Sequence, residues 1–287
     1  MTSADFSPSS NDYIIDIDLP IETVRLIEQD KLLTQAMGGL LPEQPDLSSA
    51  EQILDMACGP GKWAIDLAFT YPHLEILGVD LNATIINYAQ AIASARGLSN
   101  VDFEVMDIKK PLKFEDNTFD LINARSIVGL MDQGSWHALL AECLRILKPG
   151  GLIRLTECDA MVTNSAALQQ LNTCLCQILY KQGRTFSIDG NTFGIAYILG
   201  TLLHNAGFEK IGKRPFVLDA SYGSELHYGS CKDAETVFPL LKPFFFQSGL
   251  LTAEEFDPLY QTMLIDTLDD NFTCITYGLT TWASKTI

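Results

Sequence analysis

The sequence predicts an α/β protein built on a doubly wound, seven-stranded and mostly parallel sheet with an antiparallel last strand. Short apolar runs of strand length alternate with longer helical patterns through the middle of the chain, which is typical of a parallel sheet covered by helices. A glycine-rich turn follows the first of these runs. Acidic residues end several others, at the sheet edge where such folds bind ligands.

The N-terminal segment is expected to precede the sheet. Residues 1–12 are rich in Ser, Pro, Asp and Asn and are interpreted as a disordered tail. Apolar residues recur at helical spacing from Ile21 to Met37 and stop at Gly38-Gly39, which predicts a helix there. Residues 13–49 therefore form a helical N-terminal extension in this interpretation.

The central elements follow in a regular order. Five strands are expected at Gln52–Met56, Glu75–Val79, Asp102–Met106, Phe119–Asn123 and Leu152–Thr156. Helices are expected between them at Lys62–Thr70, Ala83–Arg96 and Ser135–Leu147. Gly97 directly follows the second of these helices, as glycine does at many helix ends.

Beyond Glu157 the alternation gives way to helical segments, which are expected at Ser165–Lys181 and Phe193–Asn205. Strands around Lys210–Val217 and at Phe272–Ser284 are expected to pair as an antiparallel hairpin. Residues 220–268 between them are interpreted as a helical cap insertion of two short helices interrupted by prolines. Residues 50–219 and 269–287 then make up the core.

The composition of the chain argues against some classes of binding partner. The 287-residue chain is 47% hydrophobic and carries a formal net charge of −17. Such a field repels phosphate backbones and anionic headgroups. We therefore expect a small-molecule partner, with neither nucleic acid nor a membrane as partner.

Cysteine usage and the N-terminus suggest the compartment. Seven cysteines are spread along the chain without a CxxC pair, so neither a metal site nor a disulfide framework is predicted. The polar N-terminus lacks an apolar signal region, and no segment is apolar enough to span a membrane. These features favour a cytoplasmic, reduced protein.

The glycine turn predicts a cofactor that contains a nucleoside. Gly59 and Gly61 allow backbone conformations closed to residues with a Cβ atom, so a ligand can approach the main chain. Asp80 ends the second expected strand, where its carboxylate can accept hydrogen bonds from both ribose hydroxyls. A dinucleotide also fits this loose pattern.

Asp55, at the end of the first expected strand, separates the two classes of cofactor. A carboxylate in this turn would repel a pyrophosphate, at a cost on the order of a few kcal/mol for an effective dielectric near 20. The same carboxylate suits a ligand that carries an ammonium and a sulfonium. The turn therefore favours a sulfonium cofactor over a nicotinamide dinucleotide.

Four segments in a fixed order carry a resemblance to a known family. They are Asp55-Met-Ala57-Cys-Gly59-Pro-Gly61, with alanine in the first glycine slot, and Phe103–Ile108, Phe119–Arg125 and Leu144–Glu157. Through these segments the chain resembles the class I S-adenosylmethionine-dependent methyltransferases, which have a Rossmann-like fold. The glycine motif and the Leu-Lys-Pro-Gly-Gly turn are most similar to the small-molecule branch that includes the quinone-biosynthesis (UbiE-like) enzymes.

The resemblance implies a set of cofactor contacts. These are Asp55, Ala57, Gly59 and Gly61 in the turn, Asp80 on the ribose, Leu81 and Met106 on the adenine faces, Asp107 and Ile108 at the adenine edge, and Asn123 near the methyl group. Asn82 is better placed than Asp80 to cap the helix that follows. Asp55 acts on the methionine moiety, accepts turn amides, or does both.

Candidates for substrate binding and catalysis are less defined. Arg125 binds an acidic substrate or pairs with Asp55 or Glu157. Glu157 ends the fifth expected strand at the crevice, and His227 lies in the insertion between two tyrosines. Tyr13 completes the candidate catalytic set, although a base is needed only if the acceptor must lose a proton.

The predicted reaction is methyl transfer from S-adenosylmethionine to a small, largely apolar metabolite in small-molecule or natural-product biosynthesis. The methyl acceptor is oxygen, nitrogen or carbon. The N-terminal helix, the Tyr180–Phe193 region and Phe244-Phe245-Phe246 are expected to wall an apolar cavity, or else to close the core or form a homodimer contact. Two alternatives are a cyclase of the same fold and a nicotinamide-dependent oxidoreductase.

Overall fold

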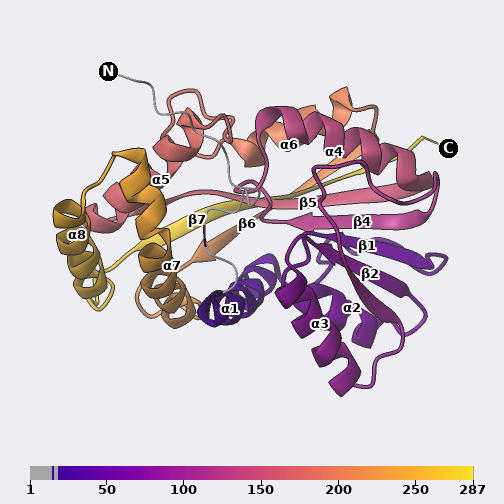
Figure 1. Cartoon of the computed structure of the whole chain (residues 1–287), viewed down its shortest axis with the longest axis horizontal. Coiled ribbons are helices and arrows are strands. Elements are labelled where there is room, and N and C mark those ends of the chain that lie inside the picture. The colour runs from indigo at the N-terminus through magenta and orange to yellow at the C-terminus, as the bar shows by residue number, and fades with distance from the viewer. Residues whose placement is uncertain (1–14, 16–18, 287) are drawn as a thin grey trace.

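A seven-stranded sheet forms the centre of the protein (Figure 1). The structure is a computed structural model that describes Ile15 and residues 19–286. The strands are β1 (Gln52–Met56), β2 (Glu75–Asp80), β3 (Val101–Val105), β4 (Phe119–Arg125), β5 (Leu147–Thr163), β6 (Glu209–Asp219) and β7 (Cys274–Ser284). Their order is β3-β2-β1-β4-β5-β7-β6. β1 to β5 pair in parallel, and β7 pairs antiparallel with both β5 and β6. This confirms the predicted fold class.

The strand order reverses between β1 and β4. β2 and then β3 are added on one side of β1, and the chain then returns to the other side of β1 with β4 and β5. In such sheets a crevice opens beyond the carboxyl ends of the strands at the reversal. The ends of β1 and β4, at Met56 and Arg125, therefore mark the expected binding edge.

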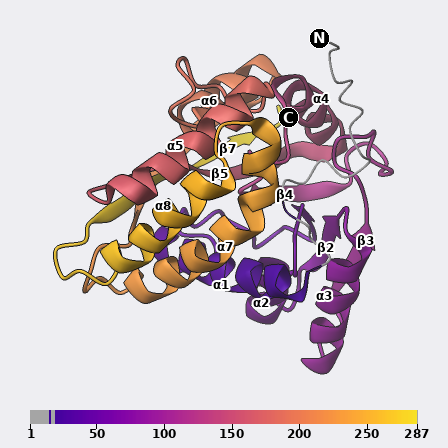
Figure 2. The same ribbon diagram turned by 60° about the vertical axis from the view of Figure 1, so that its left-hand side comes forward.

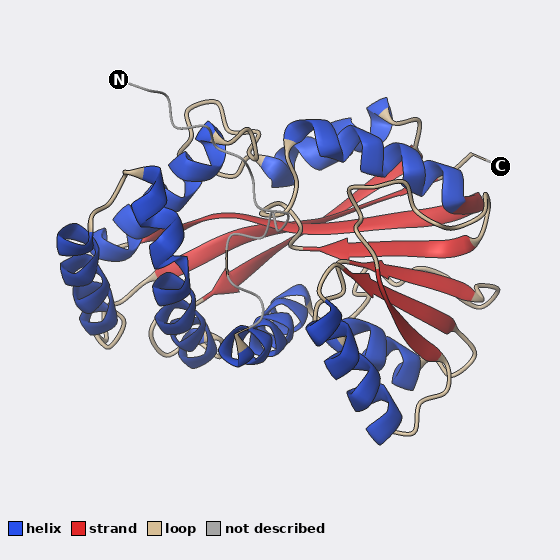
Figure 3. Cartoon of the chain, in the orientation of Figure 1, coloured by secondary structure: helices blue, strands red, loops and turns tan. Residues whose placement is uncertain are grey.

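Eight helices flank the sheet in the part of the chain that the structure describes. They are α1 (Pro20–Met37), α2 (Lys62–Thr70), α3 (Ala83–Ala95), α4 (Gln133–Ile146), α5 (Ala166–Lys181), α6 (Ile195–Asn205), α7 (His227–Ser248) and α8 (Ala253–Asp266). Figure 3 shows α4 and α6 on one face of the sheet and α2 and α3 on the other. Each face has its own apolar core, which contains Trp136 on the α4 side and Trp63 on the α2 side.

A third apolar cluster lies beyond the parallel part of the sheet. The helices α5, α7 and α8 gather there against the far ends of β5 and β7 (Figure 2). Its fully buried members include Leu171, Phe245 and Phe256. α1 packs against α7 and β6, so it lies between this cluster and the binding edge.

Two elements differ from the expectation. β5 was expected at Leu152–Thr156 but runs from Leu147 to Thr163. Leu147 already pairs with Phe119 of β4, and antiparallel pairing with β7 continues as far as Thr163 opposite Cys274. The prolines of the insertion do not interrupt its helices, since α7 is one helix of 22 residues that contains Pro239 and Pro243. An internal proline costs roughly 3 kcal/mol, and burial of the apolar face of α7 in the third cluster offsets that cost.

Among the described residues no helix is both long enough and apolar enough to cross a membrane. All seven cysteines are free thiols.

Candidate functional site

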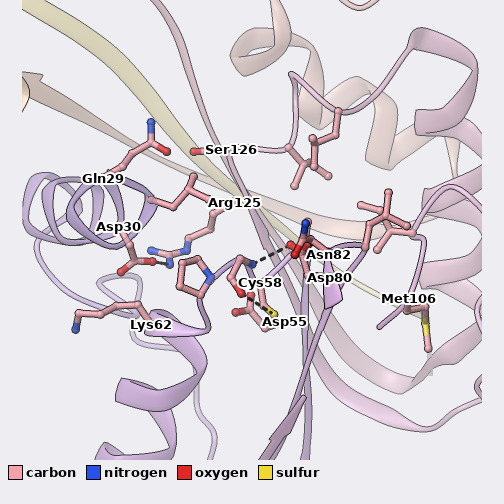
Figure 4. Close-up of a pocket in the computed structure, with 18 of the residues that line it drawn as sticks. Gln29, Asp30, Asp55, Cys58, Lys62, Asp80, Asn82, Met106, Arg125 and Ser126 are labelled. Carbon is pink, nitrogen blue, oxygen red and sulfur yellow. Dashed lines mark hydrogen bonds and ion pairs between the residues drawn. The ribbon is translucent and has the colours of Figure 1, made fainter. Parts of the chain in front are cut away.

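A cavity of about 180 Å³ opens at the binding edge of the sheet (Figure 4). Nine of the predicted site residues line it: Asp55, Ala57, Gly59, Asp80, Leu81, Met106, Asp107, Ile108 and Arg125. They come from the ends of β1, β2 and β4 and from the segment after β3. The structure therefore brings together most of the residues that the sequence singled out.

The glycine turn between β1 and α2 has a left-handed backbone at three positions. The φ angles are 50° at Ala57, 53° at Gly59 and 73° at Gly61. A Cβ atom on Gly59 would meet nothing within 4 Å, whereas one on Gly61 would lie 2.5 Å from the ring of Phe103. Gly59 thus lines the cavity, while Gly61, which does not, lets α2 approach β3 closely.

Asp80 ties the turn to the end of β2. Its Oδ2 accepts a hydrogen bond from the backbone N–H of Gly59 at 3.0 Å, and its Oδ1 accepts one from the N–H of Asn82 at 3.0 Å. Asn82 caps α3, because its side chain accepts from the N–H of Ile85. Asp80 is 9% exposed, and burial raises the pKa of its carboxyl group. Each oxygen keeps acceptor capacity for a ligand.

The segment after β3 forms another part of the wall. Asp107 Oδ1 accepts from the backbone N–H of Lys109 at 3.0 Å, and Oδ2 lies 3.2 Å from the exposed ammonium of Lys110. Met106 is nearly buried, whereas Leu81, after β2, is exposed. Apolar and acidic groups therefore line this part of the cavity together.

Asp55 begins a line of buried polar side chains that crosses three strands. Its Oδ1 accepts from Asn123 Nδ2 at 2.7 Å, and Asn123 Oδ1 accepts from Arg154 Nη1 at 2.7 Å. Arg154 in turn pairs with Glu43. Burial raises the pKa of Asp55 to about 7, although Arg125 and Asn123 act to lower it. Asn123 lies behind Asp55 and does not line the cavity.

Arg125 connects the end of β4 to α1. Its guanidinium pairs with Asp30 and donates to Thr34 Oγ1 at 3.1 Å, and it lies 5.8 Å from the ring centre of Trp63. The predicted pairing with Asp55 or Glu157 is wrong, because among the described residues the ion-pair partner of Arg125 is Asp30. Arg125 thus fixes α1 over the cavity.

Four residues of α1 line the cavity although the sequence did not indicate them as site residues. They are Leu26, Gln29, Asp30 and Leu33. Their spacing of three, four and seven residues from Leu26 places them on one face of the helix. That spacing is visible in the sequence, but it does not reveal that this face meets the end of β4.

Two of the candidate catalytic residues, Glu157 and His227, do not line the cavity. Glu157 is 1% exposed and accepts from the N–H groups of Ile127 and Val128 at 2.7 and 3.4 Å. Burial raises its pKa to about 8. His227 begins α7, and its Nδ1 lies 2.9 Å from the carbonyl oxygen of Ala220. Neither side chain lines the cavity, and Tyr13 lies outside the described residues.

A second cavity, of about 270 Å³, adjoins the first. Gln29, Leu33 and Ser126 line both. The second cavity extends among β5, α5 and α7 and is lined mainly by apolar side chains, such as Leu168, Leu175 and Phe238. Two cavities therefore meet beside α1 and the end of β4.

The expected cap walls are partly present in this second cavity. The N-terminal helix and Phe193 line it, whereas Phe244, Phe245 and Phe246 do not. Phe245 instead is fully buried and packs beside Phe256 in the third cluster.

Comparisons with known proteins point to one family. The model of a family described as a methyltransferase domain matches residues 47–206. Methyltransferase str2 of Strobilurus tenacellus is 27% identical over 154 residues, which are 53% of this chain and 51% of that protein. The ubiquinone/menaquinone biosynthesis C-methyltransferase UbiE of Desulfotalea psychrophila is 29% identical over 184 residues, with coverage of 59% and 70%. The chain spans about half the length of the first of these relatives.

A solved structure resembles nearly the whole chain. The [4+2]-cyclase SpnF covers 92% of this chain and 96% of its own, with a TM-score of 0.50 and 20% sequence identity. At that identity the likeness concerns the fold.

The matched residues 47–206 include β1 to β5, the glycine turn and most of the first cavity. They make up more than half of the 287 residues. The resemblance seen in the glycine motif is thereby confirmed, and the chain belongs to the methyltransferase-domain family.

Proposed function

We propose that this chain transfers a methyl group from S-adenosylmethionine to a small, largely apolar metabolite. The observation that carries the proposal is the pair of adjoining cavities. The first is lined by acidic groups and the glycine turn, and the second is lined mainly by apolar side chains. They share Gln29, Leu33 and Ser126, so a donor in one and an acceptor in the other would meet at these residues.

The lining of the first cavity fits the cofactor. Asp80 offers two carboxylate oxygens, each of which accepts from a backbone N–H and can also accept from a ribose hydroxyl. Open space at the Cα of Gly59 leaves room for a ligand against the main chain. Met106, Leu81 and Ile108 supply apolar contacts for an adenine ring, with Asp107 at its edge.

Charge favours a cationic ligand in this cavity. Four carboxylates line it, from Asp30, Asp55, Asp80 and Asp107, against three cationic side chains, Lys62, Lys109 and Arg125. Burial disfavours ionised Asp55, and a cation bound nearby would stabilise that ionised form. A dianionic pyrophosphate would have the opposite effect, which disfavours a nicotinamide dinucleotide.

S-adenosylmethionine supplies an electrophilic methyl carbon whose transfer turns a sulfonium into a neutral thioether. The protein then contributes position and the exclusion of water. α1 covers both cavities, and Arg125 holds it through Asp30 and Thr34. The apolar walls of the second cavity orient the acceptor toward Ser126 and Gln29.

An apolar acceptor also agrees with the overall charge and with the relatives. The net charge of −17 disfavours nucleic acid as a substrate. A relative named for ubiquinone and menaquinone biosynthesis supports a small apolar acceptor. We place the reaction in the cytoplasm, in small-molecule or natural-product biosynthesis.

Transfer of an isotopically labelled methyl group tests the proposal. The protein is incubated with methyl-deuterated S-adenosylmethionine and a set of neutral, apolar alcohols, phenols and ketones. The masses of the organic-soluble products are then measured by mass spectrometry. The expected product carries the labelled methyl group and forms together with S-adenosylhomocysteine. An isomer of an added compound, formed without consumption of the cofactor, would instead identify a cyclase.

A further inference from the structure

The second cavity contains a buried amide that has no partner. Asn172 on α5 lines this cavity and is 2% exposed. Its Nδ2 makes no hydrogen bond to any described residue. A buried donor without a partner destabilises the fold, and native proteins seldom keep one without a reason. A ligand acceptor in the cavity would satisfy this donor.

A second unpartnered polar atom lines the same cavity from another helix. Ser230 Oγ on α7 is buried and has no hydrogen-bond partner among the described residues. By contrast, Thr267 Oγ1, which also lines the cavity, donates to the carbonyl oxygen of Leu264 at 2.9 Å. The unsatisfied groups therefore come from two different helices, α5 and α7, that both line the cavity.

The charges on the cavity wall limit the substrate further. No Lys, Arg or His stands among the described residues that line it. The two carboxylates present are Asp159 and Asp233, and Asp233 is paired with Arg25 at 2.8 Å. An anionic substrate would meet negative charge in a site of reduced dielectric without a cation to pair with. A neutral molecule meets no such penalty.

We propose that the second cavity binds a neutral, largely apolar molecule that carries a carbonyl oxygen, and that Asn172 Nδ2 donates a hydrogen bond to this oxygen. This inference rests on the proposed function, since it describes the methyl acceptor of that reaction. Asn172 is then a specificity-determining residue, because a molecule of the same shape without the oxygen leaves the amide unsatisfied.

The test uses two probes of nearly equal shape. 2-Acetylnaphthalene carries a carbonyl oxygen, and 2-isopropenylnaphthalene carries a methylene group in its place. The affinity of each for the wild-type protein and for Asn172→Leu is measured by equilibrium dialysis, with no methyl donor present. The ratio of the two affinities is compared between proteins, so that differences in hydration of the probes cancel. One neutral hydrogen bond is expected to change this ratio about fivefold.

We expect the preference for the ketone to fall about fivefold in Asn172→Leu and to stay the same in the control Thr267→Val, whose hydroxyl is already satisfied within the protein. The melting temperature of Asn172→Leu should be no lower than that of the wild type, because the change removes an unsatisfied donor. An equal ratio in wild type and Asn172→Leu, or no binding of either probe to the wild type, overturns the inference. Binding of S-adenosylhomocysteine, measured separately, shows whether the proposed function fails as well.

Discussion

Asp55 is a buried acid in the lining of the first cavity. It is 3% exposed, and its carboxylate accepts a hydrogen bond from Asn123 while Arg125 lies nearby. The sequence predicts an acid in the glycine turn that acts on the methionine moiety of the cofactor, accepts turn amides, or does both. The structure adds that burial outweighs its favourable partners, so its pKa lies at about 7 rather than 3.8.

This pKa predicts how stability depends on pH. Between pH 4 and 7 the folded state keeps the proton of Asp55 while the unfolded state has released it. The contribution of protonated Asp55 to the free energy of unfolding is therefore fully present below about pH 4. It is lost as the pH rises through 7, for a total of about 4 kcal/mol. Asp55→Asn keeps an acceptor for Asn123 but has no proton to release. It should therefore lack the decrease in unfolding free energy that Asp55 causes between pH 4 and 7.

Urea unfolding at pH 5 and pH 8 measures about 3 kcal/mol of this total, since only the two pH units from 5 to 7 lie inside the window. Asp257→Asn on the exposed side of α8 is the control. The unfolding free energy of Asp55→Asn should still decrease somewhat between pH 5 and pH 8, because the pKa of Glu157 is also raised, to about 8. If Asp55→Asn and the wild type lose the same unfolding free energy between these pH values, the assignment of a raised pKa to Asp55 is wrong.

The two glycines of the turn should respond differently to substitution. Both have positive φ, so alanine at either position strains the backbone by roughly 1 kcal/mol. Gly61→Ala adds an overlap with Phe103, and overpacking costs about 1–3 kcal/mol more. Gly59→Ala faces open space in the first cavity. We expect Gly61→Ala to lower stability more, and Gly59→Ala to weaken cofactor binding more.

Unfolding curves and calorimetric titrations of the two variants separate these effects. Equal loss of stability in both variants, with equal cofactor binding, would contradict the different roles assigned to the two glycines. The sequence pattern alone treats them alike, because the overlap at Gly61 depends on Phe103, which is more than forty residues away.

At the scale of elements, α1 is the helix on which the site depends most. One face of it lines both cavities, and Arg125 anchors it to β4 through Asp30 and Thr34. The side chains of Arg125 and Asp30 are 9% and 16% exposed. Loss of one partner of a mostly buried pair leaves the other charge poorly compensated.

Asp30→Ala should therefore loosen α1. We expect faster amide hydrogen exchange over residues 20–37 than in the wild type, with α4 unchanged, and an unfolding free energy lower by roughly 1–3 kcal/mol. Lys31→Ala on the same helix is the matched control, because its pair with Glu28 is half-exposed and contributes little. Equal exchange in both variants would show that Arg125 does not hold α1 in place.

The elements also show which parts of the fold local sequence can predict. The strands β1 to β4 and the helices between them follow from periodicity and turn residues, and their predicted bounds agree within a few residues. The extension of β5 to Thr163 depends on its pairing with β7, which lies more than a hundred residues later. The continuity of α7 through two prolines depends on packing in the third cluster. Both features arise from contacts that local patterns do not contain.

For the whole molecule, two cavities of different character meet at one place. The acidic cavity is built by the ends of parallel strands, where the sequence motifs lie, and nine of its predicted residues are present. The apolar cavity is built by α5, α7 and the extended β5, whose positions depend on tertiary packing. This difference explains why the sequence indicated the cofactor residues but missed Asn172, Ser230 and Asp159.

The catalytic predictions show the same limit. In the sequence Glu157 lies close to the binding edge. Its carboxylate, however, accepts hydrogen bonds from the N–H groups of Ile127 and Val128. His227 begins a cap helix whose inner face, not its first residue, lines the cavity. Methyl transfer that depends on positioning and on the exclusion of water requires neither residue to act on the substrate.

Calorimetric titration of S-adenosylmethionine into the wild type and into Asp80→Ala tests the central claim most directly. Asp257→Ala serves as the control, and melting curves verify that each variant is folded. We expect saturable binding to the wild type and to Asp257→Ala, and loss of binding in Asp80→Ala because the ribose loses its acceptor. No binding to the wild type, or equal binding to the folded Asp80→Ala, would contradict this claim.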